Sequence, residues 1–82
     1  MKKTWTQTIT VTGLHGEPAY TLRCEPEGAE HEVRPGDQLA LTFTAPTPRG
    51  FEIAYADRAV VLCRLGDSDV SIRDKRGRSL TW

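Results

Sequence analysis

The 82-residue chain has few of the side chains on which metal sites depend. It contains two cysteines, two histidines and a single methionine, Met1. Zinc ligands usually occur in close pairs along a sequence, and neither the cysteines nor the histidines form such a pair. A blue-copper centre usually adds an axial methionine to histidine and cysteine ligands, but no histidine or methionine follows Cys63. We therefore expect no metal ligand and no cofactor.

Arrangements typical of catalysis are missing as well. Ser68, Ser71 and Ser79 lie near turns, but the sequence places no histidine to activate any of them. Gly13 and Gly16 precede an alternating, strand-like segment instead of a helix, so they do not form a phosphate-binding loop. So short a chain also encloses a substrate-sized pocket with difficulty. The sequence thus predicts a protein that is not an enzyme and has no catalytic residue.

Net charge and long apolar runs are absent too. Eleven basic and eleven acidic side chains cancel, which argues against nucleic acid as a partner. No segment approaches the length of an apolar membrane span, and Lys2-Lys3 is followed by polar residues instead of the apolar part of a signal peptide. We expect a soluble, cytoplasmic protein without a membrane partner. Eight arginines against three lysines favour a bacterial source with a GC-rich genome.

What the sequence does contain is a two-residue alternation of apolar and polar side chains, with no convincing helical pattern. Turn residues interrupt it about every eight to twelve residues, which is typical of a small all-β domain. The pattern predicts strands over residues 4–12, 20–25, 30–33, 38–44, 51–55, 59–65, 70–72 and 80–82. We expect one domain over residues 1–82, a small antiparallel β-sandwich of seven or eight short strands, Ig-like or cupredoxin-like in shape. A partly open small β-barrel is the alternative.

Alternate residues of these strands supply the expected core. Residues 59–65, AVVLCRL, are apolar at almost every position, which predicts a central strand covered on both faces. Residues 34–37, Arg-Pro-Gly-Asp, have proline and glycine where a type II turn places them. The inward-facing rows are predicted to contain Trp5, Ile9, Val11, Tyr20, Leu22, Leu39, Leu41, Phe43, Phe51, Ile53, Val61, Leu65, Val70, Ile72 and Leu80.

Threonine occupies every second position from Thr4 to Thr12. A regular row of hydroxyls could form an ice- or sugar-binding face, but such a face needs similar rows on several flat, neighbouring strands. Only Thr42 and Thr44 repeat the spacing elsewhere, and small sheets twist. Because β-branched threonine suits a solvated strand face, we interpret the row as the outer side of the first strand.

Cys24 and Cys63 each lie in a predicted strand, and two interpretations of them remain open. Residues 57–63, DRAVVLC, resemble the immunoglobulin pattern in which aspartate, alanine and tyrosine precede the second cysteine at alternating positions. The resemblance covers these seven residues, with Val61 at the tyrosine position. It supports a sandwich and implies a disulfide between the sheets. The other interpretation, favoured by a reducing cytoplasm, is a pair of buried thiols that act as small apolar side chains.

The function is predicted from the features that remain. Aromatic and arginine side chains favour the centres of protein interfaces, and edge strands of small sandwiches accept further strands. We therefore expect a non-catalytic module for protein–protein interaction or self-association. The alternatives are a small-ligand or carbohydrate-binding sandwich, and weak nucleic-acid binding through the basic C-terminal hairpin. The candidate interaction patch consists of Trp5, Tyr55, Trp82, Arg73, Lys75, Arg76 and Arg78.

Overall fold

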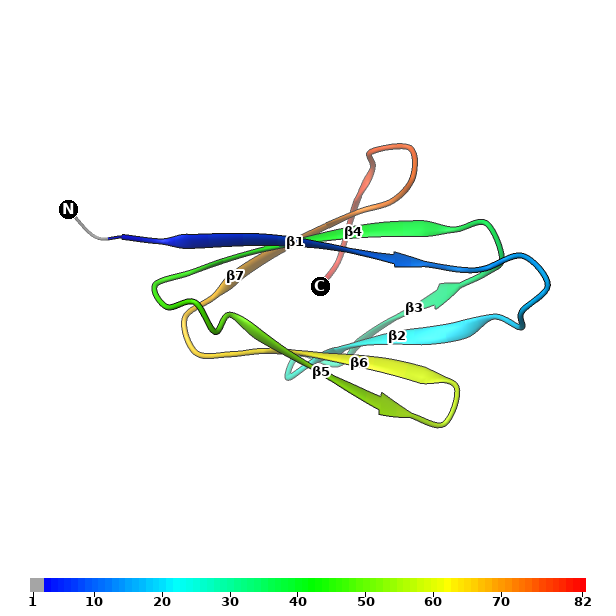
Figure 1. The fold of residues 1–82 in the computed structure, drawn as a ribbon, viewed down its shortest axis with the longest axis horizontal. Helices are drawn as coiled ribbons and strands as arrows, with labels where there is room; N and C mark the ends of the chain where they lie inside the picture. The colour runs from blue at the N-terminus through cyan, green and yellow to red at the C-terminus, as the bar shows by residue number, and fades with distance from the viewer. Residues whose placement is uncertain (1–2) are drawn as a thin grey trace.

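The computed structural model describes residues 3–82, which form eight β-strands and no helix (Figure 1). The strands are β1 (Trp5–Thr12), β2 (Tyr20–Glu25), β3 (Ala29–Val33), β4 (Gln38–Ala45), β5 (Phe51–Ala56), β6 (Ala59–Arg64), β7 (Asp69–Arg73) and β8 (Ser79–Leu80). All eight predicted strands are confirmed, with ends that differ by about two residues at most. No helix able to cross a membrane occurs in this part of the chain.

The strands form two four-stranded sheets, in the orders β1-β4-β7-β8 and β3-β2-β6-β5. Figure 1 shows these sheets as two layers, one above the other. Each sheet has two edge strands and neither closes into a ring, so the predicted β-sandwich is confirmed and the barrel is not.

The pairing of β2 with β6 is parallel, whereas the other pairings are antiparallel. The chain leaves the second sheet after β3 and runs through β4 in the first sheet. It then returns with the hairpin of β5 and β6, which places β6 beside β2 in the same direction. The predicted antiparallel sandwich is thus confirmed except at this pair, which makes the second sheet mixed.

The core lies between the inner faces of the two sheets. Its centre is Phe43, which is 1% exposed. The ring of Phe43 stacks on Phe51 with a centroid distance of 4.5 Å and meets Trp82 edge-on at 5.6 Å. The buried core cluster consists of Leu22, Cys24, Val33, Leu39, Leu41, Phe43, Leu62 and Ile72.

In strand β6 the inward-facing and outward-facing residues are shifted by one position from the prediction. Leu62 faces the core and is fully buried, whereas Val61 faces the other side of the sheet and is half-buried. Leu65, also predicted to face inward, is half-buried just beyond the strand. An uninterrupted apolar run carries no alternation, and a shift of one residue exchanges the two faces of a strand. β6 is central, as predicted, but the opposite sheet covers only one of its faces.

Local turn chemistry follows the sequence closely. Gly36 has a φ of 90°, and the amide of Asp37 donates to the carbonyl of Arg34 at 2.9 Å. These are the features of a type II turn with Pro35 and Gly36 at its centre, so this prediction is confirmed.

The threonine row of β1 is exposed on the outer face of its sheet, as predicted. The hydroxyl oxygens of Thr6 and Thr44 lie 3.4 Å apart, and those of Thr8 and Thr42 lie 3.1 Å apart. The register therefore places the two threonines of β4 opposite two threonines of β1, and the hydroxyls contribute cross-strand contacts.

The two cysteines lie in neighbouring strands of one sheet, on opposite faces. Cys24 pairs with Leu62 across the ladder and is buried in the core, whereas Cys63 pairs with Glu25 on the outer face. Both are free thiols. Side chains that point to opposite faces of a sheet cannot form a disulfide without backbone movement. The disulfide that the immunoglobulin resemblance implies is therefore not formed, and Cys24 fits the interpretation as a buried thiol.

We expect the two thiols to react at very different rates. Burial, with the negative charges of Glu25 and Glu27, raises the pKa of Cys24 to about 11, so this thiol is protonated near neutral pH. A thiol-reactive dye should modify Cys63 quickly in the native protein and Cys24 only after unfolding. A Cys63→Ser variant should lose the fast phase. Two fast phases in the native wild type would contradict this placement.

Candidate interaction surface

The two long sides of the sandwich differ in how they are closed. On one side, His31 Nε2 of β3 donates to the carbonyl of Thr81 at 2.5 Å, and Trp82 Nε1 donates to Glu27 at 2.7 Å. On the other side, β1 and β5 are the last strands of their sheets, and no hydrogen bond joins them within residues 3–82. We call the side formed by β1 and β5 the open edge.

Strand β5 turns its apolar row toward the opposite sheet, yet that row remains uncovered. Ile53 pairs with the buried Leu62 and Tyr55 pairs with Val60, so these side chains share the inner face. Ile53 is nevertheless 60% exposed and Tyr55 is 79% exposed. Among residues 3–82, Leu14 is the only other large hydrophobic side chain that is exposed. The prediction that Ile53 belongs to the core is therefore wrong about burial, although correct about direction.

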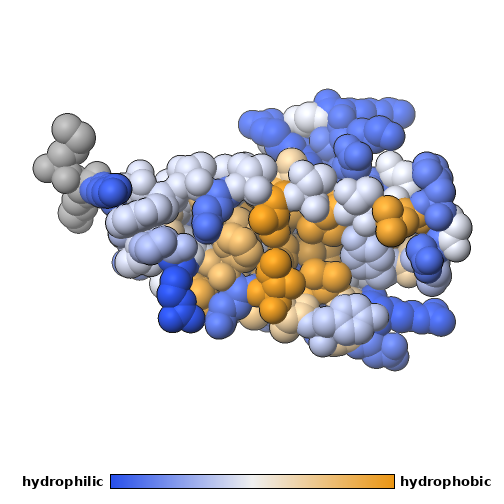
Figure 2. Space-filling view, viewed as in Figure 1, coloured by the Kyte–Doolittle hydropathy of each residue, from blue (hydrophilic) through white to orange (hydrophobic). Residues whose placement is uncertain are grey.

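The apolar side chains are visible from the side on which β1 and β5 lie in front. Figure 2 shows hydrophobic side chains gathered in the gap between the two layers, with polar side chains above and below. Facing β5, strand β1 contributes Ile9 and Val11, which are both half-buried, and then the polar Gln7. Because β1 presents so short an apolar row, the interior of the sandwich stays accessible along this side.

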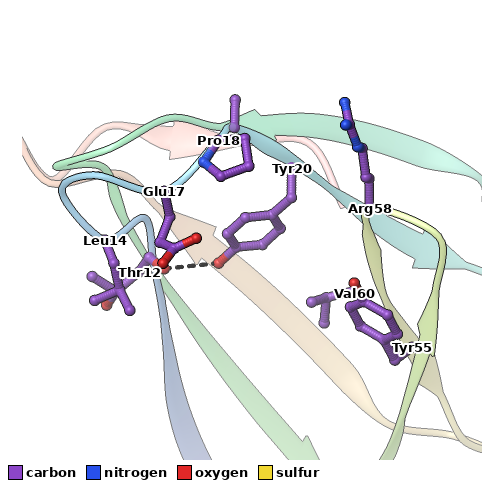
Figure 3. Close-up of a pocket in the computed structure, with 9 residues that line it drawn as sticks. Thr12, Leu14, Glu17, Pro18, Tyr20, Tyr55, Arg58 and Val60 are labelled. Atoms are coloured by element: carbon purple, nitrogen blue, oxygen red, sulfur yellow. Dashed lines mark hydrogen bonds between the residues drawn. The ribbon is translucent and has the colours of Figure 1, made fainter.

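A hollow of about 280 Å³ lies at the end of the open edge, where β1 stops (Figure 3). Leu14, Tyr55 and Val60 give it apolar walls. The hydroxyl of Tyr20 donates to the carbonyl of Thr12 at 2.9 Å, and burial raises the pKa of Tyr20, so this phenol stays neutral. The close-up shows Tyr20 and Tyr55 as the aromatic side chains of the hollow; they come from β2 and β5, which flank β6 in the same sheet.

The hollow has the composition of a contact surface. The charged residues in its lining are Glu17 and Arg58, and the other lining residues are uncharged. Within residues 3–82 no three His, Cys, Asp or Glu side chains gather closely enough to hold a metal ion. The residues that line the hollow present apolar surface and aromatic rings to a binding partner.

The residues predicted to form one interaction patch are spread over the molecule. Tyr55 lies at the open edge, but Trp82 lies on the opposite side, half-buried against Phe43. Trp5 begins β1 and is half-buried, with the ammonium of Lys3 5.2 Å from its ring centre. Of the three predicted aromatics, only Tyr55 therefore contributes to the exposed apolar surface of the open edge.

The four predicted cations do lie together, on the hairpin of β7 and β8; they are Arg73, Lys75, Arg76 and Arg78. Arg78 pairs with Asp74 at 2.8 Å, and Asp74 also accepts the backbone amides of Arg76 and Arg78. The guanidinium of Arg73 donates to the carbonyl of Gly77 at 3.0 Å. The cluster thus stabilises its own turn, and Figure 1 shows this hairpin projecting above the sandwich, away from β5.

Leu14 and Ile53 are the members of the open edge that sequence reasoning missed. Leu14 lies outside the predicted strands and Ile53 is predicted to lie in the core, because the alternation shows which face a side chain takes and not what covers that face. The sequence gives one sign that the inward row of β5 is poorly covered: the polar Gln7 interrupts the inward row of the first strand.

Glu27 closes the side opposite the open edge. Its carboxylate accepts a hydrogen bond from Trp82 at 2.7 Å and pairs with Arg64, which also donates to the carbonyl of Ser68 at 3.0 Å. The hydrogen bond from Arg64, supported by that from Trp82, lowers the pKa of Glu27. One carboxylate thus ties the end of the chain to the β2–β3 turn and to the end of β6.

The lowered pKa of Glu27 makes this closure sensitive to acid. The stabilisation is complete above the usual pKa of 4.5 and is lost as the pH falls through the lower, folded-state value. A Glu27→Gln variant lacks the charge at every pH, so its melting temperature should lie below that of the wild type near neutral pH. In acid the two should converge. Thermal melts followed by tryptophan fluorescence at a series of pH values measure this gap, and a gap independent of pH would contradict the assignment.

Comparison of the chain with models of protein families, with curated protein sequences and with solved structures found no match.

Proposed function

We propose that the protein is a non-catalytic interaction module that binds another polypeptide at the open edge. The observation that carries this proposal is the inner row of β5, where Ile53 and Tyr55 are exposed although they face the interior of the sandwich. Burying apolar surface contributes about 25 cal/mol per Å². A polypeptide that covers this row therefore gains binding free energy from side chains that the monomer leaves in water.

The backbone of β5 supports the same proposal. As the last strand of its sheet, β5 presents unpaired N–H and C=O groups along one side. A guest strand can bond to these groups and set its own alternate side chains over the apolar row. Backbone pairing would supply affinity, and Ile53, Tyr55 and the adjoining hollow would supply selectivity.

Two other functions have weaker support. The hollow beside Tyr55 could stack a small ligand or a sugar ring, but its volume of about 280 Å³ is small for a ligand site, and its polar groups are few. The basic hairpin could contact nucleic acid, but Arg73 and Arg78 already have partners within the turn. We also propose a cytoplasmic location, which the absence of a disulfide in so small a domain supports.

The proposal is tested by photo-crosslinking in the cells that express the protein. Benzoylphenylalanine at position 55 should give a discrete adduct with a polypeptide, because Tyr55 is the most exposed apolar side chain of the open edge. The same group at Thr8, on the exposed outer face of β1, is the matched control and should give none. Equal adducts at both positions, or none at position 55, would refute the proposed function.

A further inference from the structure

We propose that the polypeptide bound at the open edge is a second copy of this chain, paired through β5 about a two-fold axis at Ile53. This inference rests on the proposed function and names its partner. The two β5 strands would run antiparallel and join the two β3-β2-β6-β5 sheets into one continuous sheet. The two open edges would then face each other, and each would cover the apolar row of the other.

The hydrogen-bond pattern of β5 determines which backbone groups are available. The carbonyl of Gly50 accepts from the amide of Leu65 at 3.0 Å, so Gly50 and Leu65 form a hydrogen-bonded pair of the ladder with β6. In an antiparallel ladder such pairs alternate. Consequently Glu52 and Ala54 bond to β6, whereas the N–H and C=O groups of Phe51, Ile53 and Tyr55 point away from it, toward the open side.

A two-fold axis at Ile53 satisfies all of these groups. It places Ile53 opposite Ile53 of the second copy as a hydrogen-bonded pair. It also places Phe51 of each copy opposite Tyr55 of the other, again as hydrogen-bonded pairs. An axis at Ala54 would instead leave Phe51 opposite Asp57, beyond the end of the strand. The register centred on Ile53 therefore makes the fullest use of the free backbone groups.

The side chains agree with the same register. On the inner face, a β-branched pair forms at the axis with an aromatic pair of Phe51 and Tyr55 on each side of it. Such cross-strand pairs contribute about 0.2–1 kcal/mol each. On the outer face, Glu52 lies opposite Ala54 instead of opposite another carboxylate. No like charges face each other directly across the junction.

Charge complementarity at the ends of the strand also favours a second copy. The register that centres on Ile53 brings Arg49 of each copy level with Asp57 of the other. Within its own chain, Arg49 reaches Glu52 only at 3.9 Å and is 81% exposed. Asp57 forms no ion pair among residues 3–82. The same chain therefore carries both halves of two symmetric ion pairs.

The other edge strands are poorer candidates. β3 is lined with charges, which form the ion pairs of Arg23 with Glu30 and of Arg34 with Glu32, and charged edges discourage pairing. β8 has only two residues. β1 is long, but its inward apolar residues are half-buried and Gln7 interrupts the row, so covering it gains less. β5 has neither lysine nor proline to block an incoming strand.

Sedimentation equilibrium of the purified chain tests the inference first. We expect a reversible dimer, and an Ile53→Arg variant should weaken dimerisation by about tenfold or more, because like charges meet at the axis. Ile53 is exposed in the monomer, so the variant should fold, which circular dichroism checks. A Thr8→Arg variant on the outer face of β1 is the control and should dimerise normally. A wild type that is monomeric at every concentration would overturn the inference.

Cysteine cross-linking tests the register. In a Cys63→Ser background, Ile53→Cys should form an intermolecular disulfide on mild oxidation, because Cα atoms of a hydrogen-bonded pair lie about 5.5 Å apart. Ala54→Cys, one residue along the same strand, should not. Faster cross-linking at position 54 would overturn the register. An Arg49→Glu variant should weaken the dimer, and adding Asp57→Arg should restore it; failure of this rescue would also count against the register.

The two proposals fail in different ways. A monomeric chain whose photo-adduct at position 55 contains another protein would overturn the second copy as partner and leave the interaction module intact. A monomeric chain with no adduct would overturn both.

Discussion

Replacing Gly13 with alanine is expected to lower the free energy of unfolding by about 3 kcal/mol or more, the largest effect of any glycine-to-alanine replacement in this protein. A Cβ at this position would lie 1.9 Å from the carbonyl oxygen of Arg34 and 2.6 Å from its carbonyl carbon. Both obstructing atoms belong to the backbone, so no side-chain rotation can relieve the clash. Denaturation by urea, followed by circular dichroism, measures the loss.

The contact at Gly13 is important because it holds the turn through which the chain passes from one sheet to the other. The amide of Gly13 donates to Asp37 at 2.9 Å, and its carbonyl accepts from Gly36 at 2.8 Å. These bonds tie the end of β1 to the turn that carries the chain from β3, in one sheet, to β4, beside β1 in the other. A displaced Gly13 would therefore disturb the packing of the layers as well as one loop.

Gly16→Ala is the matched control for this prediction. Gly16 lies in the same loop with a φ of 86°, and a Cβ there would meet nothing within 4 Å. Its replacement should cost only about 1 kcal/mol, from the left-handed backbone alone. Similar losses at both glycines would show that the close approach of Gly13 to Arg34 does not determine stability.

Replacing Phe43 with alanine is expected to cost about 3–5 kcal/mol. Phe43 is the largest fully buried side chain of the described residues, and it contacts Phe51 at the start of β5 and Trp82 near the end of the chain. A domain of this size has a total stability of only several kcal/mol. We therefore expect the melting temperature to fall by roughly 20 °C, with partial unfolding near room temperature.

Trp82 reports on this core directly. Loss of the Phe43 ring should move the tryptophan emission of the native state to longer wavelength, because the indole of Trp82 loses its edge-on contact. Phe43→Leu keeps an apolar side chain at this position and should retain most of the stability. A Phe43→Ala variant within about 1 kcal/mol of the wild type would contradict the central place of this ring.

Much of the fold could be predicted because it depends on neighbouring residues. The alternation of Leu39, Leu41 and Phe43 is visible in the sequence, and all three are buried in β4. The turn at Pro35 and Gly36 follows from the φ values these residues favour. Such features require no knowledge of which strands lie side by side.

The candidate site could be predicted only in part. The sequence predicts Tyr55 and Trp82 in one interaction patch; Tyr55 lies at the open edge, but Trp82 lies on the other side of the sandwich. Strands distant in sequence decide such neighbourhoods: β8 lies opposite β3, and β1 opposite β5. The sequence shows that a residue is aromatic, but it does not show on which side of the sandwich that residue lies.

The sequence by itself determined the strands, their turns and the outward face of the threonine row, because alternation and backbone preference act over a few residues. Tertiary structure decided the phase of β6, where the apolar run carries no alternation and pairing with β2 selects Leu62 for the core. It also decided the exposure of Ile53 and Tyr55. A strand can direct its apolar row inward, but whether that row is buried depends on what the opposite sheet places over it.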